Sequence, residues 1–163
     1  MSAEVLRELG AVYRILNSFS DFILKSMALE KGQYQFLVRI KETPGLNQQM
    51  LSDNLYVCKS TTAKAVKKLM VKGYISRSVF KNDKRNYQLY LTKKGEEICR
   101  FLEFEEYFAM TTSLKGMEDK EIDLLVSSLK RIRKNVTPLF NDLKNSERES
   151  LIEKIRMNGL NMK

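Results

Sequence analysis

Histidine and tryptophan are absent from this chain, and only two of its 163 residues are cysteine. Without histidine, the chain has no histidine-based acid–base catalysis, no nucleophile activated by histidine, and few possible zinc sites. Cys58 and Cys99 form no Cys-x-x-Cys pair and no disulfide framework. The seven glycines are scattered, so the sequence contains no glycine-rich phosphate loop. These absences argue against an enzyme.

Long apolar runs are missing as well. The longest spans four residues, whereas a membrane helix needs about 20. The N-terminal residues lack the basic and then apolar pattern of a signal peptide. With 43% hydrophobic and 30% charged residues, the composition is typical of a soluble globular protein, and we expect a cytoplasmic location.

Positive charge is concentrated between Cys58 and Lys94. This stretch contains eleven lysine and arginine residues and one acidic residue, Asp83, which gives it a net charge of +10. The whole chain carries +9, so the remaining residues sum to −1. Excess positive charge confined to one segment is typical of a surface that binds a polyanion.

Three helices are predicted before and within this basic stretch. The first covers Leu29–Glu42, and the second covers Asn47–Leu55 with Asn47 as a favourable N-cap. The third runs from Ser60 to Lys72, where Gly73 allows the left-handed conformation that often ends a helix. The second and third helices, joined by a short turn, form a helix-turn-helix.

A two-stranded ribbon is predicted immediately after this motif. Tyr74–Phe80 and Asn86–Leu91 have the alternating pattern of strands, and the polar turn 81–85 joins them. Thr92 is a favourable cap for a long helix that runs toward Thr112. A helix-turn-helix followed by a ribbon is a winged helix, so we expect a mainly α fold with a small β-wing (α+β).

Apolar residues spaced alternately by three and four positions form two long helical seams near the ends of the chain. Such seams belong either to a monomeric helical core or to a dimer interface, and we favour the dimer. Pro138 lies inside the second seam and should kink that helix or end it near Thr137. Ser146–Glu149 has the pattern of a capping box for a last helix. The residues expected at the dimer interface are Val5, Leu9, Val12, Leu16, Ile122, Leu125, Leu129, Ile132 and Val136.

The predicted helix Ser60–Lys72 has an apolar and a polar face. The residues expected to be buried are Ala63, Val66, Leu69 and Met70, with Thr62 at their edge. Hydroxyl groups and lysines on the opposite face suit a helix that enters the major groove of DNA, while a solvated basic face is the alternative. We expect base contacts from Ser60, Thr61 and Lys64 and phosphate contacts from Lys67 and Lys68.

The charged tip of the ribbon decides in favour of DNA, because it can reach a neighbouring minor groove, where arginine is favoured. We expect Arg85 to enter that groove and Asp83 to orient its guanidinium group, although Asp83 also suits a simple turn. The remaining wing residues expected to contact phosphates are Lys81, Asn82 and Lys84, while Arg77 either joins them or pairs locally.

These motifs resemble the MarR (multiple antibiotic resistance regulator) family of winged-helix transcription regulators. The matching segments are Pro44-Gly45-Leu46-Asn47-Gln48, Ser60-Thr61-Thr62-Ala63-Lys64, Lys72-Gly73 and Asp83-Lys84-Arg85, followed by Leu89, Leu91, Thr92 and Gly95. The Asp-x-Arg turn followed by Leu-x-Leu-Thr-x-x-Gly is the specific part. The resemblance implies a winged helix-turn-helix domain at 29–95 and a helical dimerisation region at 1–28 and 96–163.

The resemblance further implies a homodimer that reads a palindromic operator in double-stranded DNA. Such regulators are usually repressors, and a small ligand, often phenolic, releases many of them from DNA; Tyr13, Phe36 and Tyr107 suit such a pocket but suit a helical core equally well. No cofactor or metal is implied. Ala63 and Lys64 depart from the commoner residues at these positions, so base preference is not carried over. A non-specific architectural DNA-binding protein is the alternative function.

Cys58 precedes the basic helix and lies beside Lys59. A helix N-terminus and a neighbouring cation lower a thiol pKa and favour oxidation, which would tilt the helix and weaken DNA binding. The other interpretation is a small, buried, unreactive residue in the turn. From the sequence, we favour the buried, unreactive residue.

Overall fold

The computed structural model describes residues 3–30, 32–80, 83–144 and 148–160, with side chains for all of these except 80, 83–86, 159 and 160. The chain divides into two compact units, Met1–Ser113 and Leu114–Lys163. The first contains α1 (Glu4–Leu24), η1 (Lys25–Met27), α2 (Gln33–Glu42), α3 (Gln48–Asn54), α4 (Lys59–Val71), β1 (Ile75–Phe80), β2 (Asp83–Leu91) and α5 (Lys93–Ser113). The second contains α6 (Asp119–Lys144) and α7 (Arg148–Leu160).

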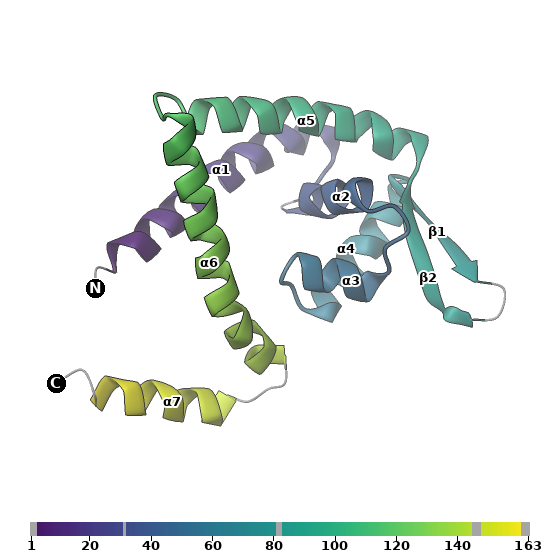
Figure 1. Ribbon diagram of the computed structural model, residues 1–163. Helices are drawn as coiled ribbons and strands as arrows, with labels where there is room; N and C mark the ends of the chain where they lie inside the picture. The colour runs from purple at the N-terminus through teal and green to yellow at the C-terminus, as the bar shows by residue number, and fades with distance from the viewer. Residues whose placement is uncertain (1–2, 31, 81–82, 145–147, 161–163) are drawn as a thin grey trace. The chain divides into compact units, whose positions relative to one another are not determined.

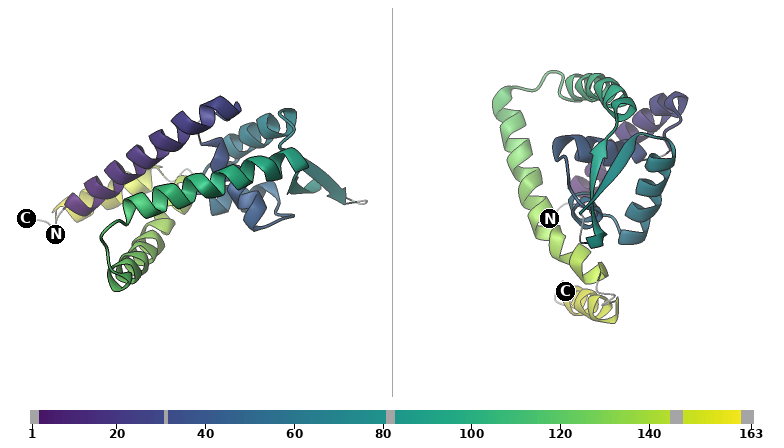
Figure 2. Two further views of the ribbon diagram at one scale, coloured as in Figure 1. Left: turned by 90° about the horizontal axis from the view of Figure 1, so that it is seen from above. Right: turned by 90° about the vertical axis from the view of Figure 1, so that its right-hand side faces the viewer.

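Helices α2, α3 and α4 lie together in the first unit, and the β1–β2 hairpin extends away from them (Figures 1 and 2). Their common core contains leucine and isoleucine side chains with 0% exposure, namely Leu37, Ile40, Leu51, Leu69 and Leu89. The predicted mainly α fold with a small β-wing is confirmed.

Helix α2 begins four residues later than predicted, at Gln33 instead of Leu29. Gly32 has a φ of 71°, and a left-handed residue at this position cannot belong to a right-handed helix that runs on from Leu29 into Gln33. Leu29 is nevertheless buried, with 6% exposure. The apolar pattern therefore marked a core residue correctly but assigned it to the wrong local structure.

Three of the predicted helix ends have the expected chemistry. The Asn47 side chain accepts a hydrogen bond from the Met50 backbone N–H at 2.8 Å, which caps α3. Gly73 follows α4 with a φ of 73°. Thr92 Oγ1 accepts a hydrogen bond from Gly95 N–H at 3.2 Å and caps α5.

The buried face of α4 differs from the prediction. It consists of Thr62, Ala65, Val66 and Leu69, which have the spacing of a single helical stripe. Ala63 is exposed instead of buried. The cause is Thr62, whose hydroxyl donates to the Cys58 carbonyl at 3.3 Å, so that this polar side chain can be buried completely.

The hairpin is longer on its second strand than predicted, because β2 already begins at Asp83. The strands pair antiparallel with Ile75 opposite Leu91, and an irregularity lies between Val79 and Phe80. The chain after α2 pairs with the other side of β2. Gly45 N–H donates to the Leu89 carbonyl at 2.9 Å, and Leu89 N–H donates to the Leu46 carbonyl at 3.0 Å. These bonds attach the hairpin to the helices.

The long helices α1 and α5 meet through one polar and one aromatic contact. Ser20 Oγ donates to Glu105 Oε1 at 2.7 Å, and both residues are buried. The rings of Phe19 and Phe108 stack with their centroids 5.8 Å apart. A buried, hydrogen-bonded pair of this kind fixes the register of two helices more specifically than apolar contact alone.

The prediction that Pro138 kinks or ends its helix near Thr137 is wrong about the end, because α6 continues to Lys144. Proline removes one backbone donor but does not prevent the neighbouring turns from bonding. Next to Pro138, the Thr137 hydroxyl donates to the Arg133 carbonyl at 2.8 Å. The capping residue Ser146 lies outside the described residues, although Glu149 is in the first turn of α7 as expected.

Gly95 generates a prediction about stability. A Cβ at this position would lie 2.1 Å from the backbone oxygen of Tyr74, so Gly95→Ala has to push α5 away from the hairpin base. We expect it to lower the free energy of unfolding by about 3 kcal/mol or more. Chemical denaturation followed by circular dichroism measures this change.

Gly10→Ala is the matched control. It also lies in a helix, but its added Cβ would meet only the flexible end of the Arg14 side chain. This variant should be neutral or stabilised by about 0.5–1 kcal/mol, because alanine favours the helix. Equal stability of the two variants would contradict the close approach at Gly95.

Candidate nucleic-acid interface

The turn between α3 and α4 sets the direction of the basic helix. Tyr56 is left-handed, with a φ of 52°. Val57 N–H donates to the Ser52 carbonyl at 3.1 Å, and the Ser52 hydroxyl donates back to the Val57 carbonyl at 2.6 Å. Ser52 has 0% exposure, so this pair of hydrogen bonds is enclosed by the core. Helix α4 therefore starts from a rigid turn.

The side of α4 away from the core is exposed along its whole length. The exposed residues include all five that the sequence assigned to DNA, namely Ser60, Thr61, Lys64, Lys67 and Lys68. Val71 is exposed to 80% near the C-terminal end of the helix. The helical spacing of the sequence also places this apolar side chain on the face opposite the core.

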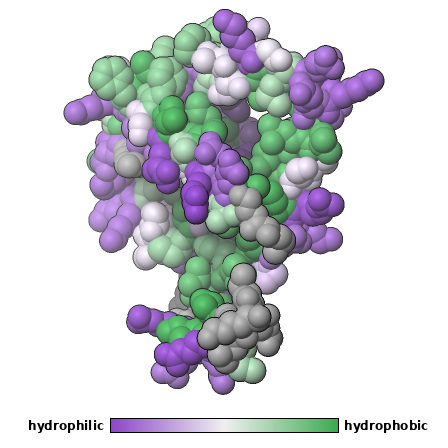
Figure 3. All heavy atoms as spheres, turned by 90° about the vertical axis from the view of Figure 1, so that its left-hand side faces the viewer, coloured by the Kyte–Doolittle hydropathy of each residue, from purple (hydrophilic) through white to green (hydrophobic). Residues whose placement is uncertain are grey.

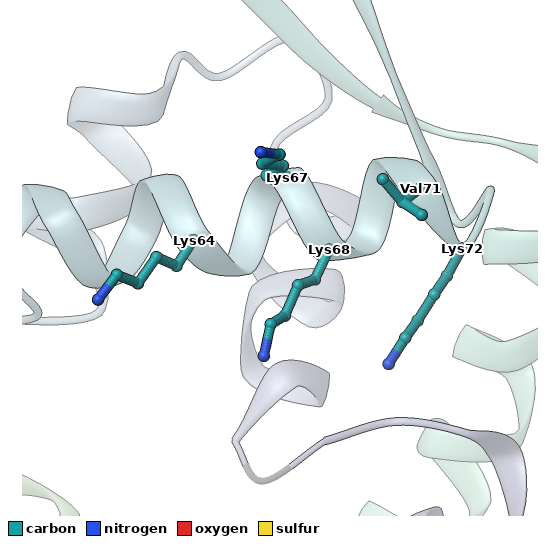
Figure 4. A pocket seen from close by; sticks show the side chains of 5 residues that line it. All are labelled: Lys64, Lys67, Lys68, Val71 and Lys72. Atoms are coloured by element: carbon teal, nitrogen blue, oxygen red, sulfur yellow. The ribbon is translucent and has the colours of Figure 1, made fainter.

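The lysines of α4 point in different directions. Lys64, Lys68 and Lys72 extend to one side of the helix, and Lys67 extends to the other (Figure 4). Lys68 forms an ion pair with Glu30, whereas Lys64 and Lys67 have no ion-pair partner within the described residues. Among the lysines assigned to DNA on α4, these two are the ones whose charge is not paired with another described residue.

Arg77 pairs locally, which was one of its two predicted roles. Its guanidinium group lies 5.7 Å from the centroid of the Tyr87 ring on the partner strand. The Tyr87 hydroxyl in turn donates to Gln48 Oε1 of α3 at 2.5 Å. The hairpin and α3 are therefore joined by a tyrosine, and Arg77 covers its ring. No pattern in the sequence indicates the contact between Tyr87 and Gln48.

The tip of the wing carries predictions that stay untested. Lys81 and Asn82 lie outside the described residues, and so do the side chains of Asp83, Lys84 and Arg85. Their backbone belongs to strand β2 from Asp83 onward. The minor-groove role of Arg85 and its orientation by Asp83 therefore remain predictions.

Cys58 is exposed, which differs from the interpretation of a buried turn residue. Its Sγ lies 3.2 Å from Ser60 Oγ and 2.9 Å from Thr61 Oγ1. Hydrogen bonds from these two hydroxyls stabilise the thiolate and lower the pKa of Cys58 to about 7. Burial has the opposite effect on Cys99, whose pKa is raised to about 11.

This cysteine network changes the environment of two predicted base-reading residues. Ser60 and Thr61 share their hydroxyl groups with the Cys58 sulfur in the first turn of α4. The sequence signal was available, because hydroxyl residues two and three positions after a helix N-cap lie within reach of the N-cap side chain. No cluster of three or more potential metal ligands occurs in the described part of the chain. No helix among those residues has the length and apolarity needed to cross a membrane.

The geometry defines a class of protein. A helix-turn-helix whose second helix exposes unpaired lysines, followed directly by a hairpin attached to its core, is a winged-helix DNA-binding fold. The comparison with known proteins is more specific. Residues 29–87 match the model of the MarR family.

Individual relatives agree with this match. The uncharacterised HTH-type transcriptional regulator YybA of Bacillus subtilis is 35% identical over 133 residues, which are 82% of this chain and 89% of that protein. The crystal structure of the transcriptional regulator SlyA is similar with a TM-score of 0.83 and 33% identity, over 87% of this chain and 100% of that one.

A structure of a MarR family transcriptional regulator from Listeria monocytogenes, complexed with a 26mer DNA, has a TM-score of 0.83 and 34% identity. The similarity covers 86% of this chain and 93% of that one. The chain belongs to the MarR family of transcriptional regulators. The resemblance found in the sequence is confirmed.

The thiol network generates a prediction about reactivity. The alkylation rate of Cys58 by iodoacetamide should rise with pH and reach half its maximum near pH 7, because the thiolate is the reactive form. Mass spectrometry of the alkylated peptides measures the rate. Cys99 is the internal control and should stay unmodified in the folded protein because it is buried.

Replacement of the Ser60 and Thr61 hydroxyls separates their effect on the pKa of Cys58 from the effect of the helix N-terminus. Ser60→Ala together with Thr61→Val should move the midpoint of Cys58 alkylation toward the ordinary thiol value of about 8.5. A wild-type midpoint already at that value would contradict the network.

Proposed function

We propose that this protein is a dimeric, sequence-specific regulator that binds double-stranded DNA through α4 and the β1–β2 wing. The observation that carries the proposal is the exposed side of α4, where Lys64 and Lys67 are unpaired within the described residues while the opposite side is fixed in the core. The similarity to the Listeria regulator that was crystallised with a 26mer DNA supports the same role.

The contacts with DNA fall into two kinds. The first two turns of α4 bear Ser60, Thr61 and Lys64, which are short or flexible enough to approach base edges in the major groove. Phosphates are neutralised by lysines further along α4 and on the wing, and Arg85 enters the minor groove with Asp83 beside it. The phosphate-binding lysines are Lys67, Lys68, Lys81 and Lys84.

A second copy of the chain covers the apolar face of α1 and the apolar face of α6. Val5 is exposed to 52%, Val12 to 51% and Val136 to 46%, and apolar side chains are visible on the surface in Figure 3. Large apolar side chains repeated along a helix face and left in contact with water usually mark an interface. A twofold dimer would present two recognition helices to half-sites about one helical turn of DNA apart.

We also propose that a small apolar or phenolic effector regulates DNA binding. The protein represses transcription by default and is located in the cytoplasm. Tyr13 of α1 and Tyr107 of α5 have exposed side chains that such a ligand could contact. Phe36 is buried, with 6% exposure, and belongs to the core of the winged helix.

Substitution of the proposed contact residues tests DNA binding. Lys64→Ala and Arg85→Ala should each weaken operator binding by about 1–3 kcal/mol, and Lys115→Ala, an exposed lysine outside 29–95, should have no effect. Fluorescence anisotropy with an operator selected from genomic fragments measures these changes.

The same assay separates a regulator from an architectural protein. Binding to the selected operator should exceed binding to random duplex by roughly 10³ or more, and affinity should fall steeply with salt. Equal affinity for both duplexes would favour the architectural alternative, and binding that ignores salt would contradict the whole interface.

Charged substitutions on the long helices test the dimer. Val12→Glu and Leu125→Glu place an anion in the proposed interface and should shift the protein from dimer to monomer in sedimentation velocity. Ser18→Glu also adds charge to an exposed position of α1, but it lies off the seam and should leave the dimer intact. A wild-type protein that sediments as a monomer would refute the dimer.

A further inference from the structure

Glu30 lies in the connection between η1 and α2, and its carboxylate contacts the C-terminal half of α4. Glu30 Oε2 accepts a hydrogen bond from Lys68 Nζ, and Glu30 Oε1 lies 3.4 Å from Lys72 Nζ. Lys68 and Lys72 extend to the same side of α4 as Lys64 (Figure 4). An acidic group from outside the basic stretch therefore lies beside the lysines of the recognition helix.

The two lysines depend on Glu30 to different degrees. Lys72 also donates to the Ala28 carbonyl at 2.7 Å and lies 3.4 Å from Gln33 Oε1, and its side chain is only 26% exposed. Lys68 is 53% exposed, and Glu30 is its single acceptor within the part of the chain that the structure describes. Loss of the Glu30 carboxylate would leave Lys72 anchored and Lys68 free.

The position of Glu30 is fixed by its backbone. Its N–H donates to Gln33 Oε1 at 3.0 Å, and its carbonyl accepts from Gln33 N–H at 2.9 Å. Gln33 is buried, with 4% exposure, so these bonds belong to the core side of the connection. The hydrogen bond from Lys68 is the main cause of a lowered pKa of Glu30, and the carboxylate is therefore ionised at neutral pH.

In the ion pair between Glu30 and Lys68, another anion can replace the Glu30 carboxylate as the partner of Lys68. Both side chains are about half exposed, and exposed ion pairs are weak and screened by salt. A carboxylate and a phosphate offer a lysine the same kind of anionic oxygen. Lys68 is one helical turn from Lys64, so a duplex whose base edges meet Lys64 also brings its phosphates near Lys68.

We propose that Glu30 competes with DNA phosphates for Lys68 and thereby weakens the sequence-independent part of DNA binding. This inference rests on the proposed function of α4. In the free protein Lys68 is held by Glu30, and each encounter with DNA has to displace it. Because phosphate contacts supply nearly all of non-specific affinity, the effect is largest for random duplex.

The test compares Glu30→Gln with wild type on a random-sequence duplex by fluorescence anisotropy at several salt concentrations. On a random duplex, wild type makes the contact between Lys68 and a phosphate only in those complexes in which Glu30 has been displaced, so Glu30→Gln should steepen the slope of log affinity against log salt by up to about 0.9. The variant should consequently lose up to about 3.5-fold more affinity than wild type between 50 and 200 mM salt. Thermal unfolding of each variant establishes that it is folded.

Three further variants identify the cause. Glu103→Gln removes one charge from the exposed pair between Lys41 of α2 and Glu103 of α5, which includes no residue of α4, and should leave the slope unchanged. Glu30→Asp keeps the charge but shortens the side chain, and it should steepen the slope as Glu30→Gln does. In a Lys68→Met background, Glu30→Gln should have no effect.

The outcomes distinguish this inference from the function on which it rests. A wild-type protein that binds DNA, with Glu30→Gln identical in affinity and slope, overturns the role of Glu30 alone. An effect that persists with Lys68→Met also overturns it, because Glu30 would then act by general repulsion of DNA. Failure of wild type to bind any duplex overturns the proposed function itself.

Discussion

The hydrogen bond from Thr92 Oγ1 to the Gly73 carbonyl, at 2.6 Å, connects the end of the recognition helix α4 to the start of α5. The same hydroxyl caps α5, and Thr92 N–H donates to the Tyr74 carbonyl at 3.0 Å. Gly95 allows the closest approach of α5 to this junction. The angle between the recognition helix, the hairpin and the long helix α5 therefore depends on a few atoms, and any displacement there would move all three elements.

Some lysines of the basic stretch form contacts within the protein and are not available to DNA. The stretch from Cys58 to Lys94 carries +10, but several of its lysines are engaged inside the fold. Lys72 donates to the Ala28 carbonyl, and Lys94 donates to the Lys72 carbonyl at 2.8 Å and lies 4.5 Å from the centroid of the Tyr74 ring. A count of charges consequently overestimates the number of cations available to DNA. The count of charges does locate correctly the segment in which these cations occur.

Local chemistry was predictable from the sequence, and contacts between distant residues were not. As helix caps, Asn47, Gly73 and Thr92 act on residues only a few positions away, so these roles followed from residue type and spacing. The burial of Thr62 depends on a hydrogen bond that hydrophobicity does not report, which is why Ala63 was assigned to the wrong face. The pairing of Glu30 with Lys68 spans 38 positions, and no periodic pattern contains that information.

The antiparallel bonds between Gly45, Leu46 and Leu89 have a consequence for solubility. A two-stranded hairpin that projects from a domain normally presents unpaired backbone groups along both sides, and such edges invite strands of other molecules. Here the chain after α2 pairs with the free side of β2 at Leu89, while the outer strand β1 carries the exposed residues Ser76, Arg77 and Ser78. Both features oppose edge-to-edge aggregation at the base of the hairpin.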